Sequence, residues 1–419
     1  MPLKQYLTTS IHLVTNTGWL LSSEVVAKAS RLLVIFTLAA TLPIIEYGTV
    51  MLALGCHEVF KLVMRSGAGS QIIQCHDEQL KGFAENGLIL QWIISIGLTL
   101  IQCASAFFIG HFYENTQLTY LLCGMAGVYL LYPIVSIRVL LLQRANNMRF
   151  YSVRNALCIT AENASIALFV ILDQGIWSVV YGKWVFAIVW LALFSLSPKN
   201  PFGFSVNLKV LKHLLLTSGR LLMTEVTRAF RNQADVLIGA KLLSPELFGI
   251  YSFAKTAGVN LGMSLSTAFN TALYPFLCDK NRQSGQNNQS KTILIMSTSV
   301  ALMFVIQALL VPVYVPLLFV QSWQQEYTTI SLLCLANVPL IYIDAYCNSL
   351  RSTAKFSSEF NVRVITLLVL IGGLALLSPN HFQTYANCIL VVNVLSLCVF
   401  LLPIFKRFNE STNLLKRSH

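Results

Sequence analysis

Charged residues are scarce in this chain. Asp, Glu, Lys and Arg together make up 11% of its 419 residues, whereas soluble domains carry about 25%. Hydrophobic residues account for 55%, and the mean hydropathy is +0.66. A chain of this composition cannot cover itself with a polar surface in water, which excludes an ordinary soluble globular protein.

Metal, redox and nucleotide motifs are also missing from the sequence. The ten cysteines stand singly, and the seven histidines never pair with each other or with cysteine at a zinc-ligand spacing. No glycine-rich loop of the phosphate-binding kind is present. We therefore expect no metal, no cofactor and no catalytic residue, and we interpret the cysteines as small apolar packing residues. We also expect no cleavable signal peptide, because the first apolar stretch is long and leads straight into a second.

The sequence instead contains a series of apolar segments of about 20 residues. A helix of that length crosses the hydrocarbon layer of a bilayer, about 30 Å thick, and a helix satisfies its own peptide groups there. We predict an all-α membrane protein with about twelve transmembrane helices. They are expected at residues 14–42, 45–64, 87–111, 117–140, 151–172, 176–196, 211–243, 247–277, 292–313, 327–349, 361–378 and 384–404.

Positive charge alternates between the links that join these segments. The N-terminus and every second link carry Lys or Arg, whereas the opposite links around 113–115, 173–175, 323–326 and 378–383 contain neither. The positive-inside rule then places both termini in the cytoplasm. Twenty of the 29 basic residues lie on this side. Topology and anionic lipid headgroups therefore account for the net charge of +12, and we expect no nucleic-acid partner.

A weak internal repeat divides the twelve segments into two sets of six. Shifting the sequence by 201 residues aligns Glu24 with Glu225 and Gly48 with Gly249, among nine identities over 18–53. Six is an even number, so both halves enter the membrane with the same orientation, as parallel repeats. We predict two six-helix lobes around a central cavity. Two prolines and a glycine interrupt the link at 197–204, so the lobes are expected at 1–205 and 206–419.

Basic residues inside the membrane segments form the candidate binding site. On segment 211–243 Glu225, Arg228, Arg231 and Asp235 share one arc of about 120°, and the first segment carries a similar but shorter stripe. A lipid-facing charge at the bilayer centre costs at least about 2.5–3.5 kcal/mol, so these groups should face protein or water. The candidate site for an anion comprises Lys28, Arg31, Arg220, Arg228, Arg231 and Lys255.

The same stripes have a second interpretation. Glu24 with Lys28, and Arg231 with Asp235, are spaced i to i+4 and can neutralise each other within a helix. Such pairing leaves an excess of cations that only an added anion would balance. The residues in excess are Arg31, Arg220, Arg228 and Lys255.

Four acidic residues lie deep in the predicted segments and are candidates for ion coupling. A carboxyl at that depth is either paired with a cation or keeps its proton, and proton-coupled transport requires the second state. Pairing is the expected state of each one. Asp344 is the strongest candidate for coupling because Pro339 should break its helix five residues earlier. Pro133 and Pro275, nearer the ends of segments 117–140 and 247–277, are expected to kink these helices. The four are Glu58, Glu162, Asp235 and Asp344.

The other charges and apolar segments suggest which helices line the cavity. Arg138 and Arg363 lie near the cytoplasmic boundary, where we expect them to snorkel to the interface. Lys183 lies about 10 Å from the outer face by helical rise, and the sequence leaves its role undecided. Segments 292–313, 361–378 and 384–404 are expected to face lipid or pack, since their interiors lack charge. The cavity should then be lined mainly by segments one, two, seven and eight, with help from four, five and ten.

One passage in the second half resembles a known family. Asp235–Gly239 followed by Ser244–Ala254 resembles the span seven to eight passage of bacterial polysaccharide transporters, the O-antigen (Wzx-type) lipid-linked oligosaccharide flippases, and Leu42–Gly48 is similar to the matching turn after their first helix. The layout agrees with their superfamily, the multidrug, oligosaccharidyl-lipid and polysaccharide exporters. That superfamily includes a peptidoglycan-precursor flippase, which usually has fourteen spans, two more than we predict here.

The resemblance implies a transporter of the bacterial inner membrane. Its substrate would be a polyprenyl-pyrophosphate-linked oligosaccharide of O-antigen or a related surface polysaccharide, and its partners would include membrane lipids, a polysaccharide polymerase and the chain-length machinery. The pyrophosphate would bind the interior cations, because arginine binds phosphate oxygens as a bidentate fork. Rocking of the two lobes would open the cavity alternately to each side.

Two alternatives remain open at this point. A multidrug or metabolite exporter of the same superfamily would differ only in substrate, but it should favour an acidic cavity for cationic drugs. An integral-membrane oligosaccharide polymerase or ligase should carry catalytic residues on a large external loop. The excess of interior cations and the short external links favour the flippase over both.

Overall fold

A computed structural model describes most of the chain. The described residues are 23, 26–27, 29–65, 69–75, 77–145, 147–196, 203, 205–259, 266, 270, 273, 289–318, 327–353, 355–377, 379 and 381–413. In this part of the chain the regular structure is helical and contains no strand. The predicted all-α class is therefore confirmed.

Helices occupy each of the twelve predicted segments, as far as these are described. The first is seen as helix over 29–41. The others are α2 (Ile44–Arg65), α4 (Asp77–Phe112), α5 (Thr116–Ala126) with η1 (Gly127–Leu131) and α6 (Tyr132–Arg144), α7 (Met148–Ile171), α8 (Ser178–Ser195), α9 (Leu208–Leu242), a helix over 245–259, α11 (Gln289–Leu318), α13 (Tyr327–Ala336) with α14 (Val338–Ser352), α15 (Phe356–Leu377) and α16 (Phe382–Asn413). Two short elements, α3 (Gly69–Gln74) and η2 (Gly175–Trp177), were not predicted.

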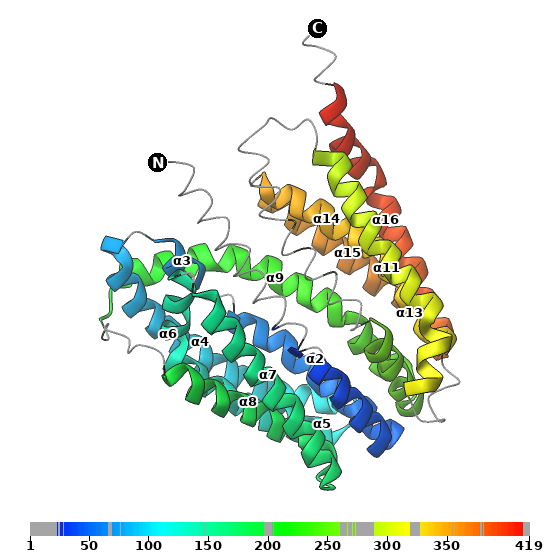
Figure 1. Cartoon of the computed structure of the whole chain (residues 1–419), viewed down its shortest axis with the longest axis horizontal. Helices are drawn as coiled ribbons and strands as arrows, with labels where there is room; N and C mark the ends of the chain where they lie inside the picture. The colour runs from blue at the N-terminus through cyan, green and yellow to red at the C-terminus, as the bar shows by residue number, and fades with distance from the viewer. Residues whose placement is uncertain are drawn as a thin grey trace. The chain divides into compact units, whose positions relative to one another are not determined.

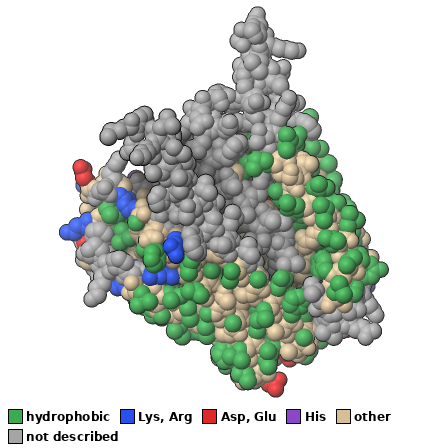
Figure 2. Space-filling view, in the orientation of Figure 1, with side chains coloured by type: hydrophobic (Ala, Val, Ile, Leu, Met, Phe, Trp, Pro, Cys, Tyr) green, Lys and Arg blue, Asp and Glu red, His purple; other side chains and the backbone are tan. Residues whose placement is uncertain are grey.

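The described surface is that of a multi-pass membrane protein. Seven helical stretches among the described residues are long and apolar enough to cross a bilayer. Large hydrophobic side chains such as Phe108, Leu376 and Leu402 are exposed, and Figure 2 shows hydrophobic side chains over most of the described surface in its view. Lys and Arg gather near α3 in the view of Figure 2 (Figures 1 and 2). An apolar surface of this extent needs lipid around it.

The described chain divides into two compact units. Unit 1 comprises the residues up to 42 and 49–229, and unit 2 comprises 43–48 and the residues from 230 onward, so the division falls inside α9. Within unit 1, α7 packs along α8 and α4 along α5; within unit 2, α11, α13 and α16 pack together (Figure 1). The lobes 1–205 and 206–419 and the central cavity between them stay predictions.

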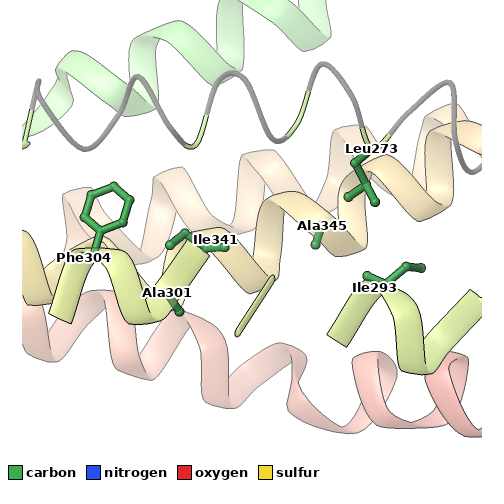
Figure 3. Packing of buried hydrophobic residues seen from close by; sticks show 6 residues of the cluster. All are labelled: Leu273, Ile293, Ala301, Phe304, Ile341 and Ala345. Carbon is green, nitrogen blue, oxygen red and sulfur yellow. The ribbon is translucent and has the colours of Figure 1, made fainter. Parts of the chain in front are cut away.

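Each unit has its own packed interior. In unit 2, Ala301 and Phe304 of α11 lie against Ile341 and Ala345 of α14 (Figure 3). A second cluster in unit 1 joins side chains of α3, α4, α6 and the first half of α9. Lipid is as apolar as these side chains, so close packing rather than escape from water holds the helices together, and small residues such as alanine favour it.

Pro339 breaks its helix as predicted. Helix α13 ends at Ala336 and α14 begins at Val338. The carbonyl of Ala336 has lost its helical partner and accepts a hydrogen bond from Asn393 Nδ2 of α16 at 2.7 Å. A freed carbonyl within lipid must find another donor, and here a neighbouring helix supplies it.

Two further prolines are compensated in the same way. Pro133 has no N–H to donate to the carbonyl of Tyr129, and this carbonyl accepts from the hydroxyl of Ser95 instead. The α-helix of this segment is interrupted by the short η1 between α5 and α6, whereas Pro275 lies outside the described residues. In α11, Pro312 leaves the Ala308 carbonyl free, and Ser331 Oγ donates to it at 2.9 Å.

The two glycines that the repeat aligns lie against each other. A Cβ atom on Gly48 would approach Gly249 Cα to 3.1 Å, and a Cβ atom on Gly249 would lie 2.2 Å from the carbonyl oxygen of Ile44. Only a residue without a side chain fits this crossing of the first turn of α2 with the helix over 245–259. Gly249 therefore needs glycine for a steric reason, whereas a methyl group on Gly48 would require its neighbours to shift slightly.

We predict that Gly249→Ala destabilises the protein by about 1–3 kcal/mol, because the added methyl group forces the backbone of α2 away. Gly372→Ala in α15 is the matched control, since its Cβ atom would meet nothing within 4 Å. That change should be neutral or slightly stabilising, as alanine is the better helix former. Thermal unfolding of the purified variants in detergent measures both, and equal effects of the two substitutions would contradict the steric account.

Candidate functional site

Charged side chains in the interior of unit 1 converge on Lys183. This residue lies on α8, and its side chain is 8% exposed. Its Nζ atom lies 2.7 Å from Glu162 Oε1 of α7 and 3.4 Å from Glu58 Oε1 of α2. Lys61, one turn after Glu58, lies 3.7 Å from the same Glu58 oxygen. Pairing of Glu58 and Glu162 is thus confirmed, through a lysine whose role the sequence left undecided.

A neutral hydrogen-bond network lies next to this cluster. His57 is fully buried and stacks on the ring of Tyr129 at 5.2 Å. The Tyr129 hydroxyl donates to Gln102 Oε1 at 2.7 Å, and Gln102 Nε2 donates to the carbonyl of Leu122 and lies 3.3 Å from His57 Nδ1. These contacts tie α2 to α4 and to the kinked fourth segment, and so fix the position of Glu58 on α2.

Asp235 is the centre of the polar cluster in unit 2. Its Oδ1 atom accepts from Lys255 Nζ at 2.7 Å, and its Oδ2 atom accepts from the hydroxyl of Tyr251. The Tyr385 hydroxyl donates to the Asp235 carbonyl. The interpretation of Arg231 and Asp235 as an i to i+4 pair is wrong, because Lys255 from the next helix reaches the carboxylate instead. Lys255 is therefore not an excess cation.

Arg231 has a different partner from the one expected. Its Nη2 atom donates to Asn393 Oδ1 of α16 at 2.6 Å, while its buried Nε atom has no hydrogen-bond partner in the described structure. Asn393 also donates to the Ala336 carbonyl at the Pro339 break. One amide thus joins α9, α13 and α16, so α16 is a packing helix with a polar contact at its centre.

Asp344 belongs to a chain of ion pairs. Arg363 Nη1 lies 3.1 Å from Asp344 Oδ1, and Arg363 Nε lies 3.1 Å from Glu359 Oε1. Arg351 binds both oxygens of Glu359, at 2.9 and 2.7 Å. The expectation that Arg363 snorkels is wrong: its side chain is buried and bridges two carboxylates. Asp344 retains an exposed fraction of 30%.

The remaining predicted cations differ in their surroundings. Arg31 is exposed, and no carboxylate among the described residues lies within 4.0 Å of it. Arg228, expected to be in excess, instead pairs with Glu225 one turn earlier, although 43% of its side chain stays exposed. Arg138 donates to the carbonyl of Ser195 at 2.8 Å. Glu24, Lys28 and the side chain of Arg220 lie outside the described residues.

The described part of the chain contains no group of three or more His, Cys, Asp or Glu that could hold a metal ion. Five cysteines are buried, as their interpretation as packing residues predicts, whereas Cys398 is exposed and Cys75, Cys103 and Cys123 are partly buried. The described cysteines are free thiols. The ion pairs of the described residues join lysine or arginine to aspartate or glutamate.

Several residues of these clusters were not singled out from the sequence. Asn393 and Gln102 are amides inside otherwise apolar segments, and that position is itself a signal, because a buried amide needs partners. Glu359 lies at the start of its segment, where a charge is unremarkable by position alone. Tyr251 and Tyr385 gave no signal, since tyrosine is common in membrane helices.

Comparison with known proteins gives one family and one fold. The family model described as "Polysaccharide biosynthesis protein" matches residues 38–327, more than half of the chain. No curated protein matches the sequence. Solved structures do match: "Lipid II flippase MurJ" in an inward closed conformation has a TM-score of 0.71 at 13% identity, covering 95% of this chain and 90% of that one.

Multidrug transporters share the same fold. An inward-facing transporter of the MATE family and the MOP superfamily has a TM-score of 0.66 at 12% identity, covering 93% of this chain and 96% of that one. A MOP superfamily transporter from Pyrococcus furiosus has a TM-score of 0.58 at 11% identity, with 96% of each chain covered. At such low identities these structures establish the fold alone.

Proposed function

Because this chain belongs to the polysaccharide biosynthesis protein family, we propose that it is a flippase for polyprenyl-pyrophosphate-linked oligosaccharides. It carries repeat units of O-antigen or a related surface polysaccharide from the cytoplasmic to the outer leaflet of the bacterial inner membrane, with both of its termini in the cytoplasm. The family match is the observation that carries this proposal. A fold shared with a lipid II flippase supports it.

Chemistry within unit 1 is consistent with an anionic headgroup. Arg31 and Arg228 retain exposed side chains, and arginine binds phosphate oxygens through a planar fork of N–H donors. Lys28 and Arg220 are the other members of the proposed set that belong to unit 1. Its remaining members, Arg231 and Lys255, belong to unit 2 and are weaker candidates, because Asn393 and Asp235 already engage them. The prenyl chain stays in lipid, and the sugars follow the pyrophosphate.

Transport by this fold requires that the substrate site open alternately to the two sides. Among the four deep acids, Glu58 and Asp344 keep substantial exposure, 45% and 30% of the side chain, whereas Glu162 and Asp235 are closed within their ion pairs. All four are paired with a cation in the described structure, so ion coupling requires one of these pairs to open during transport, and the more exposed Asp344 and Glu58 are the leading candidates. A polysaccharide polymerase and the chain-length machinery would receive the flipped product.

Cells that lack this protein test the proposal. We expect lipid-linked oligosaccharide to accumulate on the cytoplasmic side and surface polysaccharide to be lost, with both restored by the wild-type chain. A multidrug exporter would give a different result, namely raised drug sensitivity with normal levels of lipid-linked oligosaccharide. That second result would overturn the flippase proposal.

A further inference from the structure

Glu58 is surrounded by cations in unit 1. Lys61 and Lys183 approach the same carboxylate oxygen, Oε1, from α2 and α8. Arg31 on the first helix is also close enough to Glu58 to interact with it electrostatically. Two lysines from two helices therefore share one carboxylate oxygen, and Arg31 on a third helix adds a positive charge at longer range.

The contacts of Glu58 are loose in comparison with those of its neighbour. Lys183 lies 2.7 Å from Glu162, a distance typical of a strong charge-assisted hydrogen bond, and both side chains are nearly buried. The same lysine lies 3.4 Å from Glu58, and Lys61 lies 3.7 Å from it. Glu162 thus holds Lys183 in place. Glu58 is the more exposed of the two carboxylates, and its contacts with both lysines are longer than a normal charge-assisted hydrogen bond.

The position of Lys61 is fixed independently of Glu58. Its ammonium group lies over the ring of Phe186, 5.0 Å from the centroid, which is a cation–π contact. Arg31 is exposed, and Lys183 is held by Glu162. Removing the Glu58 carboxylate would therefore leave Lys61 and Lys183 in place without the anion that they share, and Arg31 exposed.

We propose that Glu58 is a resident carboxylate in an anion-binding subsite formed by Arg31, Lys61 and Lys183, and that the pyrophosphate of the substrate displaces it. This inference rests on the proposed function and adds two lysines that the predicted site did not include. Pyrophosphate carries more negative charge and more acceptor oxygens than a carboxylate, so it can engage all three cations at once. When the substrate leaves, Glu58 returns and neutralises the subsite.

A returning carboxylate makes release easier. Three cations without a counter-ion would hold a pyrophosphate tightly, and slow release limits turnover. Glu58 competes for the same cations and lowers the affinity to a level at which the headgroup can leave. The subsite thereby exchanges one anion for another and is never left without a counter-ion.

The test measures binding of farnesyl pyrophosphate and of inorganic pyrophosphate to the purified full-length chain in nanodiscs, with farnesol as the control for the tail. We expect Glu58→Gln to bind both pyrophosphates about fivefold more tightly and farnesol equally well. Lys61→Gln should bind them about fivefold more weakly, and the double variant should return toward the wild type. Glu246→Gln, which removes an exposed acid in the first turn of the helix over 245–259, is the matched control and should leave binding unchanged.

Each outcome decides between the two proposals. If the wild type binds the pyrophosphates and Glu58→Gln binds them equally or more weakly, the displacement model fails and the proposed function stands. If Glu58→Gln does not fold, the carboxylate is structural and the model fails as well. If no variant binds either pyrophosphate, the proposed substrate itself is wrong. Tighter binding of inorganic pyrophosphate but not of farnesyl pyrophosphate would also overturn the model, because it would assign the subsite to free anions.

Discussion

A chain with Arg363→Met is expected to lose about 3 kcal/mol of stability. Arg363 lies between Asp344 and Glu359, and Glu359 is only 1% exposed. Removing one partner of a buried ion pair costs about 3–5 kcal/mol, because the other charge remains without compensation. The lower end applies here, since Arg351 still neutralises Glu359 and Asp344 is partly exposed.

Thermal unfolding in detergent and protein levels in membranes measure this loss. Adding Asp344→Asn to Arg363→Met should restore most of the stability, because the orphaned carboxylate is then gone. Arg138→Met is the control, because the partner of Arg138 among the described residues is a backbone carbonyl at a helix end. Normal stability of Arg363→Met would show that Arg363 lies in the headgroup region as the sequence first suggested, and would overturn the ion-pair chain.

Substitution of Arg31 by glutamine is expected to reduce transport about 10- to 100-fold with unchanged protein levels. Arg31 is exposed and lacks a close carboxylate among the described residues, so its guanidinium is available to a phosphate. A hydrogen bond to a charged group contributes about 1.5–3 kcal/mol, which corresponds to that range. Arg228→Gln should have a smaller effect, because Glu225 already neutralises Arg228.

Both variants are measured by restoration of surface polysaccharide in cells that lack the protein, with the amount in the membrane determined in parallel. Arg31→Lys keeps the positive charge but loses the planar pair of N–H donors of the guanidinium, and it should restore part of the transport. Two results would contradict a role in binding: full transport by Arg31→Gln, or loss of transport that follows loss of the protein.

Apolar length and proline position were enough to predict the helices. The segments expected at 151–172 and 327–349 are α7 (148–171) and α13 with α14 (327–352). The Pro339 break was predictable because proline removes a donor whatever surrounds it. The identity of the new donor, Asn393, was not predictable, since it lies 57 residues away from Ala336 on another helix.

The sequence predicted that the deep carboxyls are paired with cations, but not which cation pairs with which carboxyl. A deep carboxyl needs a cation, and Glu162, Asp235 and Asp344 each have one. Spacing along one helix favoured Arg231 as the partner of Asp235, but Lys255 reaches it across the turn between two helices. Pairs between helices depend on how the helices rotate against each other, which a single sequence does not encode in its spacing.

We propose above that this chain moves a pyrophosphate-linked oligosaccharide across a bilayer. Proteoliposomes that contain the purified protein and a fluorescent polyprenyl-pyrophosphate oligosaccharide test it directly, with a membrane-impermeant quencher added outside. We predict that the quenched fraction rises from the outer-leaflet share toward completion in wild-type liposomes, and much more slowly with Arg31→Gln. Equal quenching in protein-free and wild-type liposomes would contradict the claim.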